Sequence, residues 1–168
     1  RQRKVDVVHG QAQFTGPHEV AVDTGSGTRV IRFDQAIIAA GSEPARLPNL
    51  PDDARIVDST GALALPDVPA RLLVIGGGII GLEMATVYLA LGSQVTVVEL
   101  LEELIPGADR DLVKPLEQRL RKQCEQILLG TRVTGVVAGA DGLLVSFSGP
   151  KAPAQARFDR VLVAVDNR

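Results

Sequence analysis

Gly76, Gly78 and Gly81 lie within GGGIIG with the spacing G-x-G-x-x-G, directly after the apolar run RLLVI. Glycine at these positions permits a tight turn, close approach of the backbone to a pyrophosphate, and packing of the next helix against the strand. The free N–H groups at the start of that helix favour anions. The spacing therefore predicts a dinucleotide-binding loop; the competing interpretation is a generic turn at a helix start.

An acidic residue follows at the distance that such a loop requires. Glu99 closes QVTVVE, 18 residues after Gly81, where a carboxylate can accept hydrogen bonds from the ribose hydroxyls of an adenosine. The same charge would repel a 2′-phosphate, and residues 100–105 (LLEELI) contain no Arg or Lys. The sequence therefore predicts NAD rather than NADP, unless Glu99 is only an exposed charge at a strand end.

Alternating strands and helices must position this loop. From residue 71 the sequence predicts a strand at LLVI, a helix over 79–91, a strand at QVTVVE and an amphipathic helix over 111–123 that contains Pro115. A hairpin turning at Asp141-Gly142 and a buried parallel strand at 161–165 follow. These elements indicate the α/β class, with a Rossmann-like doubly wound parallel sheet and an inserted β-meander. The apolar stripe of the 111–123 helix is expected at Leu112, Val113, Leu116 and Leu120.

The N-terminal part has a different pattern. Short runs at 5–9, 19–23 and 29–33 predict a small antiparallel meander, and AIIAAGSEP predicts a buried parallel strand that stops abruptly. Residues 44–58 have a proline-rich, linker-like composition, and Ser59-Thr60 could cap a short helix at GALAL.

Composition excludes several classes of function. The net charge of −2 and the scarcity of aromatic residues predict no nucleic-acid partner, and the apolar runs are too short for a membrane span. Cys124 is the only cysteine and cannot form an internal disulfide, so we expect a cytoplasmic location and a packing role for Cys124. No metal site has credible spacing, and His9 and His18 are expected to be surface or packing residues.

The stretch GGGIIGLEMATVYLALGSQVTVVE, with IPGADRD after it and IIAAGSEP before it, resembles the dihydrolipoamide dehydrogenase family over residues 4 to 164. The resemblance implies a flavoenzyme in which dihydrolipoamide reduces a disulfide and electrons pass through FAD to NAD⁺. It implies a partial FAD-binding domain at 1–44, with its own β-meander, and an NAD-binding domain at 45–163. Residues 164–168 depart from the family pattern. The implied partners are an acyltransferase component of a 2-oxo acid dehydrogenase complex, which carries the dihydrolipoamide, and a second subunit in a homodimer.

The resemblance also implies individual contacts. Ile79 would lie over the nicotinamide pocket and Val133 on the adenine. Glu83 would lie near the nicotinamide, although a Glu in the first turn of a helix can simply favour the helix dipole. The implied NAD contacts are Gly76, Gly77, Gly78, Ile79, Ile80, Gly81, Glu83, Glu99 and Val133. The implied FAD contacts are Ala12, Ala40, Gly41 and Ser42.

Several parts of the family pattern have no counterpart in these residues. The N-terminal flavin-binding glycine motif, the C-x-x-x-x-C redox pair and the C-terminal His–Glu pair are absent. We therefore expect no catalytic residue in this chain and no turnover by the chain alone. Two alternatives stay open: a stand-alone NAD(H)-binding module, and a related flavoenzyme such as a soluble transhydrogenase or a mercuric reductase.

Overall fold

The computed structural model describes residues 5–41, 43, 47–48, 50–65 and 67–165. They belong to two compact units, residues 1–42 and residues 43–168, which are described separately. Among the described residues, the longest apolar helices fall short of what crossing a membrane requires.

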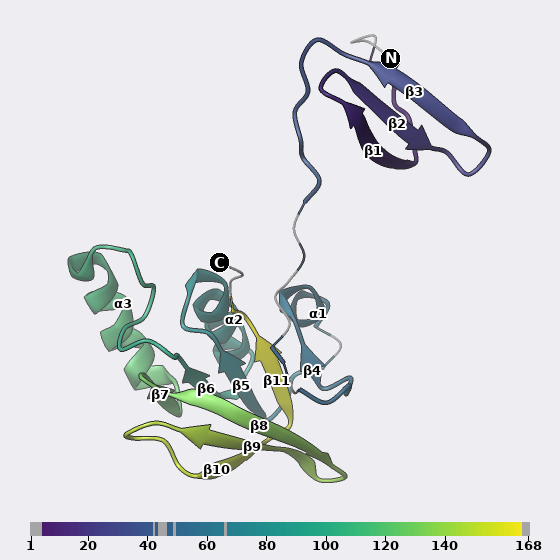
Figure 1. Ribbon diagram of the computed structural model, residues 1–168. Helices are drawn as coiled ribbons and strands as arrows, with labels where there is room; N and C mark the ends of the chain where they lie inside the picture. The colour runs from purple at the N-terminus through teal and green to yellow at the C-terminus, as the bar shows by residue number, and fades with distance from the viewer. Residues whose placement is uncertain (1–4, 42, 44–46, 49, 66, 166–168) are drawn as a thin grey trace. The chain divides into compact units, whose positions relative to one another are not determined.

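The N-terminal unit is a three-stranded antiparallel sheet in the order β1-β2-β3 (Figure 1). Its strands are β1 (Gln11–Gly16), β2 (Glu19–Asp23) and β3 (Thr28–Arg32). The prediction of the first strand at 5–9 is wrong. A two-residue turn connects β1 to β2 and pairs Gln11 with Asp23, whereas residues 5–9 would need a long connection to reach the same partner.

The predicted buried strand at AIIAAG is wrong as well. Residues 36–41 form no strand, and Ile37 and Ile38 are 95% and 75% exposed. A parallel strand is stable only between neighbours that satisfy its backbone N–H and C=O groups. Within the described part of the chain no strand pairs with this run, so its apolar composition alone does not bury it.

The second unit contains a five-stranded parallel sheet in the order β4-β11-β5-β6-β7. These strands are β4 (Ile56–Val57), β5 (Arg71–Ile75), β6 (Gln94–Val98), β7 (Gln126–Leu128) and β11 (Arg160–Val163). Helices α1 (Ser59–Leu63), α2 (Ile79–Ala90) and α3 (Arg110–Gln123) cover one face of the sheet (Figure 1). A meander of β8 (Arg132–Gly139), β9 (Gly142–Ser148) and β10 (Gln155–Phe158) covers the other (Figure 1). The predicted α/β class and Rossmann-like sheet with an inserted meander are confirmed.

The sheet carries a separate apolar core on each face. In β5, Leu72 and Val74 belong to the core beneath the helices, whereas Leu73 and Ile75 belong to the core beneath the meander. This alternation follows from the two-residue repeat of a strand. Because both faces are covered, β5 is apolar from Leu72 to Ile75, as its sequence RLLVI predicts.

Helix α2 connects β5 to β6 and ends at a glycine. The N–H groups of Gly92 and Ser93 donate to the carbonyls of Leu89 and Tyr88 at 3.1 and 2.9 Å, and Gly92 has φ +104°. This is the Schellman arrangement, in which a left-handed residue satisfies the last carbonyls of a helix. The buried Tyr88 hydroxyl donates to the Ala62 carbonyl at 2.9 Å and so ties α2 to α1.

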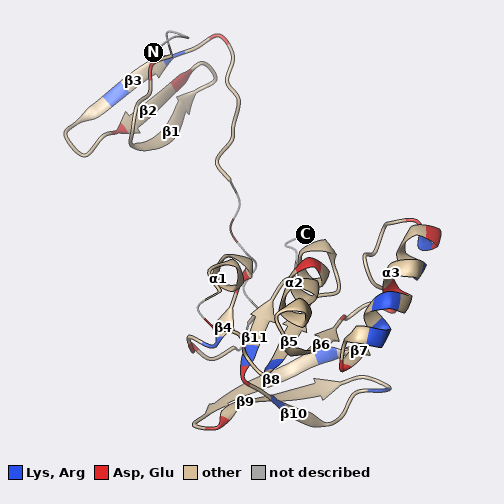
Figure 2. Ribbon diagram, turned by 180° about the vertical axis from the view of Figure 1, so that it is seen from behind, with Lys and Arg blue, Asp and Glu red and all other residues tan. Residues whose placement is uncertain are grey.

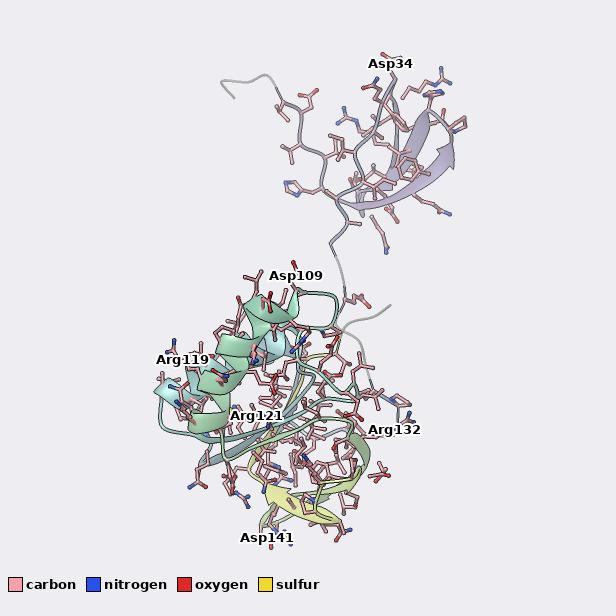
Figure 3. The ribbon with its side chains drawn as sticks, turned by 90° about the vertical axis from the view of Figure 1, so that its left-hand side faces the viewer. Asp34, Asp109, Arg119, Arg121, Arg132 and Asp141 are labelled. Atoms are coloured by element: carbon pink, nitrogen blue, oxygen red, sulfur yellow. The ribbon has the colours of Figure 1, made fainter. Side chains whose placement is uncertain are left out.

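Two local predictions about the other helices need correction. Asp58 caps α1, since its carboxylate accepts the N–H of Gly61 at 2.8 Å; Ser59 and Thr60 lie inside the helix. In α3, Val113 and Leu120 are buried, but Leu112 is 76% exposed and does not belong to the apolar stripe. Lys and Arg residues lie along α3 (Figure 2). Asp109, labelled in Figure 3, is the N-cap residue at the start of this helix.

Candidate functional site

Gly76 follows β5 directly and lies where two parallel strands end side by side. Its N–H donates to the carbonyl of Val98 at 2.8 Å, and its φ is +116°. A Cβ on this residue would meet the carbonyl of Ala164, just beyond β11. The position therefore requires glycine both for its backbone conformation and for the approach of the neighbouring strand.

Gly77 is tied to the end of β6 by Glu99. The Gly77 N–H donates to Glu99 Oε2 at 2.6 Å, and the Leu101 N–H donates to Oε1 at 2.8 Å. A Cβ on Gly77 would lie 2.6 Å from Leu104 Cδ2 and 3.0 Å from the Glu99 Cβ. The carboxylate is thus fixed by two backbone donors, and its remaining lone pairs are available to a ligand.

Gly78 is the N-cap of α2 and has extended backbone angles, with φ −77° and ψ −175°. Its carbonyl accepts the first helical bond, from Leu82 at 3.1 Å, but it has no side chain to cap the helix. No acceptor for the N–H groups of residues 78–81 lies among the described residues. These donors and the positive end of the helix dipole form a cradle suited to phosphate.

Gly81 lets α2 approach the strand that precedes it. A Cβ at this position would meet the carbonyl of Gly76 and would lie 3.3 Å from a methyl group of Val74. The crowding at Gly76, Gly77 and Gly81 gives each glycine a structural reason beyond general flexibility. The loop accordingly fits the pyrophosphate of a dinucleotide, because a phosphate can approach its backbone closely and its N–H donors are free.

Ile79 and Ile80 begin α2 beside this cradle and are 62% and 44% exposed. Glu83 is exposed too, but it is the fifth residue of α2, so the prediction that it lies in the first turn is wrong. The alternative role of Glu83, a favourable interaction with the helix dipole, is therefore weak, because this interaction falls off beyond the first turn. Val133 lies in β8, half-buried against the meander-side core.

The loop lies at the carboxyl ends of β5, β6 and β11. Strands β6 and β7 follow β5 on one side in chain order, whereas β11 lies on the other side. This reversal of strand order is where open parallel sheets bind nucleotides. Thr131, after β7, donates its N–H to the Glu99 carbonyl at 2.9 Å, so the neighbouring strand end also supports Glu99.

The candidate FAD residues belong to the other unit. Ala12 is exposed in β1 opposite Val22, and Ala40 and Gly41 are exposed in the segment after β3. Ser42 lies outside the described residues. Nothing crowds Gly41, although its φ of +77° favours glycine. The described residues of this unit do not by themselves form a site for FAD.

The remaining candidates for chemistry lie elsewhere. Burial raises the pKa of the half-buried Cys124 thiol to about 11, and the side chain packs against the helix-side core. The residues that the structure describes include no cluster of three metal-ligating side chains. A cavity of about 770 Å³ lies beside β4, lined by Asp53, Asp58 and Val163 among others, and not by the glycine loop. Sequence analysis missed Leu104 and Ile105, which support the loop and carry no motif.

Nearly the whole chain is similar in sequence to known proteins. Residues 1–165 match the family model described as pyridine nucleotide-disulphide oxidoreductase. The chain is 53% identical to a dihydrolipoyl dehydrogenase of Vibrio cholerae over 167 residues, which cover 98% of the chain and 35% of that protein. A dihydrolipoyl dehydrogenase of Haemophilus influenzae is 50% identical over the same shares of both proteins. The chain therefore spans about a third of the length of these curated relatives.

Solved structures show the same similarity. A Cu(II) complex of a cysteine-to-serine mutant of the flavoprotein disulfide reductase RclA of Escherichia coli matches 96% of this chain and 36% of its own with a TM-score of 0.82 and 30% identity. A water-forming NADH oxidase of Lactobacillus brevis, bound to NADH, matches 93% of this chain and 36% of its own with a TM-score of 0.74 and 25% identity. The resemblance found in the sequence motifs is confirmed.

Proposed function

Because the chain belongs to the pyridine nucleotide-disulphide oxidoreductase family, we propose that its residues 43–165 bind NAD(H) in a flavoenzyme of the dihydrolipoyl dehydrogenase type. The chain corresponds to part of such an enzyme. The observation that carries the proposal is the glycine loop with free N–H groups at the start of α2 and the Glu99 carboxylate beside it. The NADH-bound Lactobacillus brevis oxidase supports the choice of dinucleotide.

Each part of the site has a distinct task in this proposal. The N–H groups of residues 78–81 hold the pyrophosphate, and Glu99 accepts hydrogen bonds from the adenosine ribose. Ile79 and Ile80 offer apolar surface next to the nicotinamide, and Glu83 lies one turn further along α2. Val133 would contact the adenine. NAD⁺, when bound, supplies the hydride acceptor, and this part of the protein orients it.

The whole enzyme would oxidise dihydrolipoamide with NAD⁺ and would need FAD and a redox-active disulfide. We propose Ala12, Ala40, Gly41 and Ser42 as its FAD contacts in this chain. The partners would be a second subunit and an acyltransferase that carries the lipoyl group, in the cytoplasm. Identities of 50–53% with dihydrolipoyl dehydrogenases favour this substrate over those of transhydrogenases or mercuric reductases.

One observation favours a second candidate function, that of an NAD(H)-binding module acting without flavin. Residues 43–168 form a compact unit with an apolar core on both faces of their sheet. Neither candidate predicts turnover by the 168-residue chain with NADH, lipoamide and added FAD, because no redox pair of cysteines is present. Native mass spectrometry of the protein from its source separates the two candidates: a larger subunit that carries one flavin would support the flavoenzyme, and a flavin-free species of 17.8 kDa would support the separate module.

The proposed site is tested by titrating the purified chain with NADH and, separately, with NADPH in a calorimeter. We expect binding of NADH and weaker binding of NADPH. The informative variant is Gly78→Asp, whose backbone angles suit a capping residue. Relative to glycine, Asp at an N-cap stabilises a helix by only about a few tenths of a kcal/mol, yet its carboxylate would occupy the donors that phosphate needs.

The variant should therefore keep or raise the melting temperature and lose NADH binding. Undiminished NADH affinity in Gly78→Asp would contradict the placement of the pyrophosphate. A preference of the unmodified chain for NADPH would contradict the role of Glu99. Together the two outcomes test the two ends of the site separately.

A further inference from the structure

The glycine loop is supported on its core side by two residues that follow Glu99, Leu104 and Ile105, which we call the clasp. The Ile105 N–H donates to the Gly77 carbonyl at 2.9 Å. The Leu104 side chain is fully buried and packs against Gly77, where a Cβ would lie 2.6 Å from Leu104 Cδ2. Both members of the clasp therefore touch the same residue of the loop.

Ile105 adopts a backbone conformation that β-branched residues rarely take. Its φ is +47°, and in the described part of the chain Leu65 is the other non-glycine residue with positive φ. Such a conformation persists where the surrounding structure over-determines it, and it concentrates at functional sites. Here the Arg110 guanidinium donates to the Leu104 carbonyl at 2.8 Å, and the Ala108 N–H donates to the Ile105 carbonyl at 3.2 Å.

The hydrogen bond from Ile105 fixes the direction of a donor in the cradle. In a trans peptide the carbonyl and the following N–H point in opposite directions. No cis peptide occurs among the described residues. Because the Gly77 carbonyl points at Ile105, the Gly78 N–H must point away from the clasp, toward the side where α2 begins. Glu99 meanwhile holds the Gly77 N–H, so that donor stays with the protein.

We infer that Leu104 and Ile105 are positioning residues, which hold the Gly77–Gly78 peptide in the phosphate-binding orientation before the dinucleotide arrives. The inference rests on the proposed function, since it assigns these residues to the same site. Loss of the clasp lets the peptide rotate, and apparent affinity then falls by the fraction of molecules that keep the binding orientation. The sequence carries no sign of this role, because neither residue belongs to the glycine motif.

The test compares two buried leucines of one core. Leu104 and Leu120 are 0% and 1% exposed, and both belong to the helix-side core. Of these two leucines, only Leu104 lies next to Gly77. We expect both Leu104→Ala and Leu120→Ala to lower the melting temperature. Measured by calorimetry well below that temperature, the Kd for NADH should rise about tenfold in Leu104→Ala alone, if a tenth of the molecules keep the orientation.

Equal Kd values in the two variants would overturn the inference, because general loosening of the core would then explain any change in the Kd for NADH. If Leu104→Ala does not fold, Leu104→Val and Leu120→Val give the same comparison with a smaller deletion. A backbone ester at Ile105 removes the N–H and leaves the side chain. It should raise the Kd for NADH as well, and an unchanged Kd would refute the role of this hydrogen bond.

Hydrogen exchange separates this inference from the proposed function. In the ligand-free chain, we expect the amides of Gly77 and Ile105 to exchange faster in Leu104→Ala than in Leu120→Ala. If the unmodified chain does not bind NADH, the proposed function fails, and the exchange comparison still decides whether the clasp holds the loop. Equal exchange rates at both amides would show that it does not.

Discussion

Replacing Glu99 with Gln tests whether one carboxylate both holds the glycine loop and selects the cofactor. The substitution keeps the shape of the side chain but leaves one oxygen in place of two. In the native chain these oxygens accept the N–H groups of Gly77 and Leu101 at 2.6 and 2.8 Å. In Glu99→Gln, one of these N–H groups must therefore face an NH₂ group that cannot accept.

The expected cost follows from these two bonds. A hydrogen bond to a charged group contributes about 1.5–3 kcal/mol, and a neutral one about 1 kcal/mol. Losing one charged bond and weakening the other should lower the free energy of unfolding by about 2–4 kcal/mol. For a unit of this size, that lowers the melting temperature by roughly 5–15 °C.

The assay is thermal unfolding followed by circular dichroism, with Glu102→Gln as the matched control. Glu102 lies in the same loop and makes no hydrogen bond or ion pair with another described residue, so its variant should melt within about 2 °C of the unmodified chain. Glu99→Gln should also narrow the preference for NADH over NADPH, because the repelling charge is gone. A melting temperature equal to that of Glu102→Gln would refute the structural role that we assign to Glu99.

Three further outcomes are expected. Gly76→Ala should lower the free energy of unfolding by about 3 kcal/mol or more, measured in urea, because φ +116° and the Ala164 carbonyl both oppose a Cβ; a loss below about 1 kcal/mol would contradict this. Burial raises the pKa of Cys124 from 9.0 to about 11, so its thiol should react with a disulfide reagent at pH 8 about 100-fold more slowly than in denaturant. The free energy of unfolding should fall more steeply between pH 9 and 11 in the native chain than in Cys124→Ala, and equal slopes would contradict this. The Arg55 guanidinium lowers the pKa of Asp53 from 3.8 to about 2. The stability that this carboxylate contributes should therefore be full above pH 4 and be lost as the pH falls through 2. An NMR titration of Asp53 with a midpoint near 4 would contradict the lowered pKa.

The sequence predicts those elements whose partners lie close in the chain. Strand β5, helix α2 and strand β6 follow one another, and their glycines, apolar runs and Glu99 are enough to locate them. The short β4 and β7 escaped prediction because their sheet neighbours lie far away in sequence. The exposed run at 36–41 shows the reverse, since a strand-like composition forms no strand without a neighbour.

The residues that support the glycine loop escaped prediction for a related reason. The residues that a ligand would touch belong to a recognisable spacing, whereas Leu104 and Ile105, which support the loop, belong to no motif. Ile105 contributes an N–H, which every residue except proline possesses, so its type reveals nothing of this role. Asp58 could be missed among Ser59 and Thr60 because all three residue types cap helices, and only the geometry shows which one does.

Because β5 contributes to an apolar core on each face of the sheet, no polar residue among 72–75 fixes its register. Residues 72–75 are all apolar and buried, so a slip of one residue would exchange the two faces without exposing a charge. The glycines prevent it. A forward slip would bring Ile75 into the crossing beside the Ala164 carbonyl, and a backward slip would bring Leu82 into the place of Gly81. The glycine spacing thus also fixes the strand alignment during folding, and a variant without these glycines should lose this alignment as well as the proposed nucleotide binding.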